Sequence, residues 1–370
     1  KALRCFEQMQ VEGVHPDGIT FVCSLKACAC IGALIKLQEI HSKIAKMRLL
    51  EKDIVLANTL IGIYVKFRLV DKAREVFDKL LIRDVVSWTA LISGYAEEGN
   101  AGKSLECFER MQSEGLFPDV VTFTCVLMAC GNSLAMDKGK QIHGQVLSRG
   151  LLETDIVLGD ALVNMYVKYG VVSKAHKVLK QLRYRDVVTW NALIGGYAQQ
   201  GLCHEAFKCL KQMQSEGVSP DEVTFLCVLS ACGFSGLFDD AQIIFENMAK
   251  KYEISPNLKH HTYLVGAFGC GGHFNKAMSV IKSMPCIEYP LVWRALLSTC
   301  VRWGNVKVGK MAFDHALRLD DSCAATYILM GHIFLATNMR EDDAMVKSLT
   351  YSDFVKARKI VWGDLNKFFH

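Results

Sequence analysis

The sequence predicts an all-α fold of stacked antiparallel helix pairs, because a long internal repeat coincides with helical spacing of the apolar residues. The dipeptide Pro-Asp recurs every 102 residues, at positions 16, 118 and 220. The same spacing relates several aromatic and cysteine positions: Phe21, Phe123 and Phe225; Cys28, Cys130 and Cys232; Trp88 and Trp190. A chain of 370 residues is long for one globular core, whereas stacked repeats enlarge a core unit by unit.

Each repeat divides by internal similarity into segments of 35, 36 and 31 residues, lengths typical of helical hairpins. Apolar residues at i, i+3, i+4 and i+7 predict the first helix of the segment 85–119: Trp88, Leu91, Ile92 and Tyr95. The same spacing predicts the second helix of the segment that starts at 187: Ala206, Cys209, Leu210 and Met213. One hairpin cannot bury its apolar face alone, so we expect the hairpins to stack.

Glycines mark the expected helix ends. Gly99 should separate the two helices of its segment, and Gly115 with Pro118 should end the second helix. Arg68 stands where the equivalent segment has Gly170. The helix-terminating glycine expected at this position is therefore missing.

Composition excludes several classes of protein. Although 51% of the residues are hydrophobic, no apolar run reaches the roughly 18 to 20 residues of a membrane span, and we expect no membrane association. A net charge of +5 is too small to indicate a sequence-blind polyanion binder. Fifteen cysteines lie within apolar helical patterns, which favours reduced and buried thiols. Because the chain begins with Lys1 inside a helical pattern, we expect the natural N-terminus and any targeting segment to be missing.

The repeated segments resemble the pentatricopeptide repeat proteins, in the plant-type branch that alternates standard, long and short motifs (the PLS subclass). The resemblance rests on VVSWTALISGYAEEG at 85 and VVTWNALIGGYAQQG at 187, on the TF-x-C-x-L-x-AC runs at 20, 122 and 224, and on NTLIGIYVK at 58 and DALVNMYVKYG at 160. It implies a right-handed superhelical α-solenoid.

The resemblance also implies a domain order. Residues 1–17 would be a partial standard motif, and 18–289 a tandem array of long, short and standard motifs. Residues 290–346 resemble the degenerate motifs of a C-terminal E-type region, through VWRALLSTCVRWGNVKVGKMA at 292 and YILMGHIFLATN at 327. Residues 347–370 form a divergent tail.

By the same resemblance, each motif binds one nucleotide of single-stranded RNA. The family reads bases with the fifth and last residues of a motif, and an apolar second residue sandwiches the base. Carried over, the reader pairs are Asn58 with Asp84, Thr89 with Asp119, and Asn191 with Asp221, and the sandwiching residues are Val55, Val86 and Val188. The family pattern implies U, G and U or C at these three motifs.

The residue chemistry fits this implication but leaves an alternative open. An Asn amide offers a donor and an acceptor to a pyrimidine edge, whereas a shorter Thr hydroxyl leaves room for a purine. Asn58 and Asn191 could instead be satisfied helix-start residues. Asp119 and Asp221, like Asp17, each follow a proline and are also good helix caps.

Histidine and cysteine patterns do not predict a metal or cofactor. His41 and His143 are equivalent, but the third copy has Phe245 there, which favours an apolar slot over a ligand position. His260-His261 has no neighbouring ligand cluster. The cytidine deaminase domain of related proteins needs His-x-Glu followed by Cys-x-x-Cys, and neither motif occurs. We therefore expect no enzyme, no metal and no cofactor.

The functional hypothesis is a specificity factor for C-to-U RNA editing in a mitochondrion or plastid. A DYW-type cytidine deaminase or other editing factors would act in trans. Two alternatives stay open: an organellar splicing or RNA-stability factor, and a protein-interaction scaffold like the tetratricopeptide repeats. The alternating segment lengths disfavour the scaffold, whose motifs have a constant length.

Overall fold

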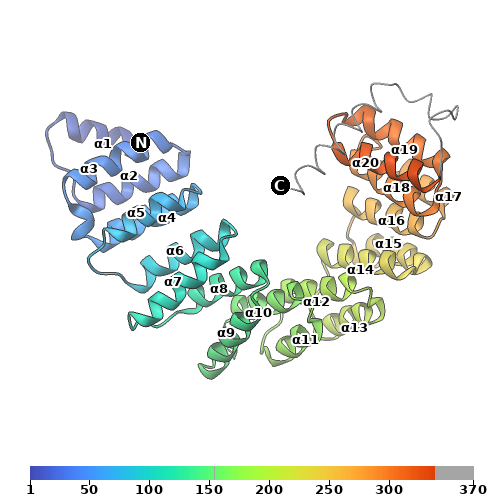
Figure 1. The fold of residues 1–370 in the computed structure, drawn as a ribbon, viewed down its shortest axis with the longest axis horizontal. Helices are drawn as coiled ribbons and strands as arrows, with labels where there is room; N and C mark the ends of the chain where they lie inside the picture. Colours follow the sequence, from blue (N-terminus) through green and yellow to red (C-terminus); the bar gives the residue numbers. More distant parts are fainter. Residues whose placement is uncertain (154, 338–370) are drawn as a thin grey trace. The chain divides into compact units, whose positions relative to one another are not determined.

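The computed structural model describes residues 1–153 and 155–337, and this part of the chain is helical without a strand (Figure 1). The helices follow one another as antiparallel pairs, so the predicted all-α fold of stacked helix pairs is confirmed. The chain forms two compact units, Lys1–Arg185 and Asp186–His370. Residues 347–370, assigned to a tail, and the end of 290–346 lie outside the described residues.

The first unit contains eleven α-helices: α1 Ala2–Val11, α2 Gly18–Ile31, α3 Leu34–Lys46, α4 Ile54–Lys66, α5 Val70–Asp78, α6 Val85–Glu97, α7 Ala101–Ser113, α8 Val120–Ser133, α9 Met136–Ser148, α10 Ile156–Lys168 and α11 Val172–Gln181. Two 3-10 turns, Leu49–Glu51 and Leu151–Glu153, follow α3 and α9.

The second unit contains nine described helices: α12 Val187–Gln199, α13 Cys203–Ser215, α14 Glu222–Ser235, α15 Phe238–Tyr252, α16 Leu258–Cys270, α17 Phe274–Ser283, α18 Pro290–Trp303, α19 Val306–Leu319 and α20 Ala324–Ala336. No described helix of the protein is long and apolar enough to cross a bilayer.

Within each unit, the even-numbered helices form one layer. In the first unit, α6 packs on α4 and α8 as well as on its own partner α7. In the second unit, α14 contacts α12, α16 and its partner α15 in the same way. Helices α6 and α14 are thus each held on three sides, which fixes the residues at their N-terminal ends relative to the next pair.

The core lies between these helices and contains the apolar residues that the repeat singled out. Trp88, Leu91 and Ile92 are completely buried. The ring of Trp88 meets Phe77 edge to face, with centroids 4.5 Å apart. Gly94 lets α6 approach closely, because a Cβ there would come within 2.8 Å of Val65. The predicted first helix and its buried face are therefore confirmed.

The turns agree with the sequence at the glycines but not at Arg68. Gly99 and Gly115 are left-handed, with φ of 77° and 79°. Arg68 adopts the same left-handed turn at φ 58°, and α4 still ends at Lys66. The missing glycine therefore does not abolish the turn: a hydrogen bond from the guanidinium to the carbonyl of Glu97 (2.8 Å) helps to hold Arg68 there despite the steric cost.

No cysteine of the described residues forms a disulfide, but the cysteines are not all buried. Seven are buried, and burial raises the pKa of Cys107 to about 11. Four others are exposed: Cys5, Cys23, Cys30 and Cys286. The expectation of buried thiols therefore holds for seven cysteines and fails for these four, because apolar helices in a stack also present one face to solvent.

Candidate nucleic-acid interface

An aspartate or asparagine precedes the first helix of most pairs and caps it. In the first unit, Asp119 accepts a hydrogen bond from the backbone N–H of Thr122 at 2.8 Å. In the second unit, Asp221 accepts from the N–H of Thr224 at 2.8 Å. The same cap occurs at Asp17, Asp53, Asp84, Asp155, Asp186 and Asn257. The capping role considered for Asp17, Asp119 and Asp221 is thus confirmed.

The two reader asparagines are not helix-start residues. Asn58 lies in the second turn of α4, and its Nδ2 donates to both carboxylate oxygens of Asp84, at 3.1 and 3.2 Å. Asn191 lies equivalently in α12, and its Nδ2 donates to Asp221 at 2.9 Å. Each predicted Asn–Asp pair is therefore brought together, across the boundary between one helix pair and the next.

Thr89 and Asp119 are brought together only through a third residue. The Oγ1 of Thr89 lies 2.6 Å from the Oγ1 of Thr122, and the hydroxyl of Thr122 donates to Asp119 at 2.7 Å. Thr122 is completely buried, and Thr89 is 9% exposed. Sequence reasoning missed Thr122, although the recurring Asp-x-x-Ser/Thr pattern marks its position as a capping-box residue.

Thr224 has the equivalent position in the second unit and contacts Asn191 directly. Its Oγ1 lies 2.6 Å from Oδ1 of Asn191 and 2.9 Å from Oδ1 of Asp221. Burial alone would raise the pKa of Asp221, but hydrogen bonds from Thr224 and Asn191 outweigh it and lower that pKa below its ordinary value. The carboxylate is thus held in its charged form.

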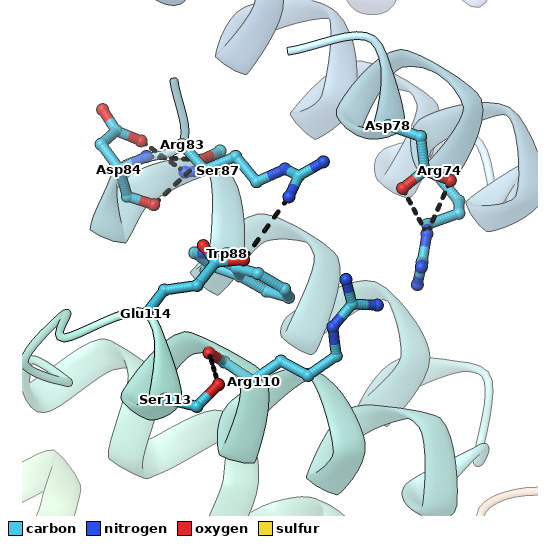
Figure 2. Close-up of polar contacts among 9 residues, drawn as sticks. All are labelled: Arg74, Asp78, Arg83, Asp84, Ser87, Trp88, Arg110, Ser113 and Glu114. Atoms are coloured by element: carbon cyan, nitrogen blue, oxygen red, sulfur yellow. Dashed lines mark hydrogen bonds and ion pairs between the residues drawn. The ribbon is translucent and has the colours of Figure 1, made fainter. Parts of the chain in front are cut away.

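Ser87 differs from Thr122 and Thr224, although it occupies the same position. Its hydroxyl turns back on Asp84, accepting from the backbone N–H and donating to the carbonyl, both at 2.9 Å (Figure 2). Oδ1 of Asn58 is left buried and without a hydrogen-bond partner.

The predicted sandwiching valines are exposed. Val55, Val86 and Val188 have exposed fractions of 64%, 59% and 51%, which core packing does not explain. The second residue of the neighbouring first helices is also an exposed aliphatic: Ile19, Val121 and Val157 in the first unit, and Val223 and Leu291 in the second. We call these residues, with the three valines, the aliphatic row.

Basic side chains share the face of the aliphatic row in the first unit. Lys66 follows Val55, and Lys168 follows Val157, by three helical turns, and both lysines are exposed. This face therefore offers an apolar residue near one end of a helix and a positive charge near the other.

The histidines do not form a metal site. Both ring nitrogens of His260 are hydrogen-bonded, to Asn257 at 2.8 Å and to the carbonyl of Glu222 at 2.9 Å. His41 and His143 each contact a tyrosine hydroxyl, at 2.7 and 2.9 Å, from a partly buried slot. Among the described residues, no group of three or more His, Cys, Asp or Glu side chains is arranged to hold a metal ion.

Known proteins match this repeat pattern. The profile of the PPR repeat family matches residues 83–132 and 185–233, and that of the PPR repeat matches 55–85 and 223–252. The putative pentatricopeptide repeat-containing protein At3g28640 of Arabidopsis thaliana is 34% identical, over 91% of this chain and 68% of its own length. The Arabidopsis protein CRR2, chloroplastic, is 33% identical over 94% of this chain and 54% of its own. The Arabidopsis protein At3g25060, mitochondrial, is 31% identical over 94% and 58%.

Two solved structures share the fold. The pentatricopeptide repeat protein PPR10, in complex with an 18-nt psaJ RNA element, superposes with a TM-score of 0.75 at 14% identity, over 97% of this chain and 52% of its own. PPR10 from maize gives 0.56 at 18% identity, over 95% and 57%.

These relatives decide between the repeat families considered above. They are named as pentatricopeptide repeat proteins and not as tetratricopeptide repeat proteins. The chain spans about half the length of several curated relatives, from 43% to 54%. At 34% identity to a relative of which it covers 68%, the chain belongs to the pentatricopeptide repeat family.

Proposed function

We propose that the chain binds single-stranded RNA sequence-specifically, with one nucleotide for each helix pair. The observation that carries the proposal is a polar pair, a side chain of one first helix bonded to the cap of the next, beside an exposed aliphatic residue. It occurs at Asn58–Asp84 and at Asn191–Asp221. A purely structural cap would explain the aspartates but not the exposed valines.

The arrangement suits a splayed base. A base inserted between successive members of the aliphatic row within one unit would bury apolar surface on both of its faces, and its edge would meet the reader pair. Lys66 and Lys168 would neutralise phosphates on the same face. Duplex RNA hides its base edges, so the proposal requires an unpaired strand. The binding of an RNA element by PPR10, which shares the fold, supports this proposal.

The reader pairs give base preferences. In a strand running 5′ to 3′ along the chain, Asn58–Asp84 would select U, Thr89–Asp119 G, and Asn191–Asp221 U or C. The same proposal includes the assignment of 18–289 to an array of alternating long, short and standard motifs. It also includes the assignment of 290–346 to an E-type region.

A binding titration tests RNA recognition. The purified chain should select a common sequence from a randomised single-stranded RNA pool, and should bind it more tightly than the same sequence placed in a hairpin stem. Equal affinity for the strand and the stem would refute recognition of base edges by this surface.

We further propose that the biological role is C-to-U editing in a mitochondrion or plastid, with a DYW-type deaminase recruited in trans. The relatives named chloroplastic and mitochondrial support an organelle. The chain alone should leave a cytidine-bearing target unchanged, and adding a separate deaminase domain should give conversion to U only when the chain is present. RNA binding without such stimulation would favour splicing or RNA stability as the role.

A further inference from the structure

A buried hydroxyl separates one reader from its aspartate. Thr122 is the third residue of α8, has no exposed surface, and lies between Thr89 on α6 and Asp119 at the start of α8. We propose that Thr122 is a specificity-determining positioning residue, which fixes the hydroxyl of Thr89 as a hydrogen-bond acceptor toward the base. This inference rests on the proposed RNA recognition.

The hydroxyl hydrogens determine the direction of the two hydrogen bonds that link Thr89, Thr122 and Asp119, which we call the relay. Thr122 has one hydroxyl hydrogen, and the carboxylate of Asp119, 2.7 Å away, can only accept it. The contact of 2.6 Å between Thr122 and Thr89 also needs a hydrogen. That hydrogen must then come from Thr89. The hydroxyl of Thr89 keeps only lone pairs for a ligand.

A fixed acceptor discriminates between the purines. The Watson–Crick edge of guanine carries two neighbouring donors, N1–H and N2–H₂, whereas adenine places an acceptor, N1, beside its single donor group. An acceptor-only Thr89 can bond guanine and would meet the lone pair of adenine N1. The relay thus supplies a physical reason for G at the motif 85–119.

The asparagine pairs do not need such a relay. An amide already separates its donor from its acceptor, and Asp84 or Asp221 fixes the Nδ2 of its asparagine directly. In the first unit, the hydroxyl of Ser87 bonds the backbone of Asp84 (Figure 2). In the second unit, the hydroxyl of Thr224 bonds Oδ1 of Asn191, and Nδ2 is still held by Asp221. Ser87 therefore provides a matched control: the same position in the motif, with a hydroxyl that does not contact the reader.

The test compares Thr122→Val, Thr122→Ser and Ser87→Ala in the complete chain. The probes are four RNAs of the pool-selected sequence that differ only at the nucleotide aligned with Thr89. A Thr89→Asn variant identifies that nucleotide, because the variant should move the preference there from G to U. We expect the parent to prefer G over A about tenfold, equivalent to about 1.4 kcal/mol. Thr122→Val should reduce this preference to less than about threefold, and Thr122→Ser should restore it.

The control separates reading from stability. Ser87→Ala should lower the midpoint of thermal unfolding and leave the preference at the nucleotide aligned with Asn58 unchanged. A G preference that persists in Thr122→Val, or an equal loss of affinity for all four RNAs, would overturn the relay and leave RNA recognition intact. A parent chain without any preference at that nucleotide would instead overturn the proposed function of the motif.

Discussion

The junctions α4–α6 in the first unit and α12–α14 in the second contain the same reader pair in different polar surroundings. In both, an asparagine donates to the aspartate that caps the next first helix. Thr224 also bonds Oδ1 of Asn191, whereas Ser87 leaves Oδ1 of Asn58 without a partner. Two identical Asn–Asp pairs can therefore differ in how firmly their amide is held, and the residue responsible lies outside the pair.

The largest difference should appear on removal of the aspartates. Asp221→Ala removes a helix cap, leaves Nδ2 of Asn191 without its acceptor and takes away one of the two oxygens that the hydroxyl of Thr224 contacts, so we expect a loss of about 2–3 kcal/mol in the free energy of unfolding of the second unit. Asp84→Ala should cost less, about 1–2 kcal/mol, because the hydroxyl of Ser87 bonds the backbone of residue 84 and keeps both partners when the carboxylate is removed. Urea unfolding of both variants measures the difference. Equal losses would contradict the account of the two surroundings.

Making the first junction resemble the second should strengthen it. Ser87→Thr places the hydroxyl-bearing side chain of Thr224 beside Asn58, and a bond to the unpartnered Oδ1 should add about 1 kcal/mol of stability. The reciprocal Thr224→Ser variant should lose a similar amount. A stability unchanged in both variants would mean that backbone geometry, and not the third residue, decides which partner the hydroxyl takes.

A third comparison concerns turns. Leu134 is left-handed with φ 56°, at a position where the other two copies have Gly32 and Gly236, with φ 71° and 73°. Leu134→Gly should relieve the steric cost and stabilise the first unit by about 0.5–1 kcal/mol, after the entropy of the added glycine is subtracted. Gly236→Leu should destabilise the second unit in return. Thermal unfolding of the two variants checks both signs.

The smallest expected effect depends on pH. Burial lowers the pKa of His41 and of His143, so the unfolded chain binds protons more readily, and stability should fall as the pH drops below the ordinary histidine value of about 6.5. The third copy has Phe245 at this position. The double variant His41→Phe and His143→Phe should lose less stability between pH 7.5 and 5.5, as measured by urea unfolding at both pH values. An identical pH dependence would show that other groups cause the acid sensitivity.

The sequence predicted the helix pairs because the buried apolar residues recur every 102 residues: Trp88 and Trp190 lie at this spacing, and both are completely buried. It also located Asn58, Thr89 and Asn191 beside the caps of the next pairs. It could not predict the turn at Arg68, where a hydrogen bond to the carbonyl of Glu97 helps to hold an unfavourable backbone conformation. Nor could it identify Thr122 or Thr224, because each looks like an ordinary capping residue, and its second partner lies 33 residues earlier in the chain.

Exchange of Asn191 for Thr tests the central claim most directly. The variant recreates the Thr89–Asp119 combination on the equivalent helix, with Thr224 in the place of Thr122. Binding should be titrated with two RNAs that differ only at the aligned nucleotide. The account predicts that preference moves from a pyrimidine to G, by roughly tenfold to a hundredfold, or about 1–3 kcal/mol. An unchanged ratio between the U and G RNAs, with both affinities lowered together, would contradict base reading and leave Asn191 a packing residue.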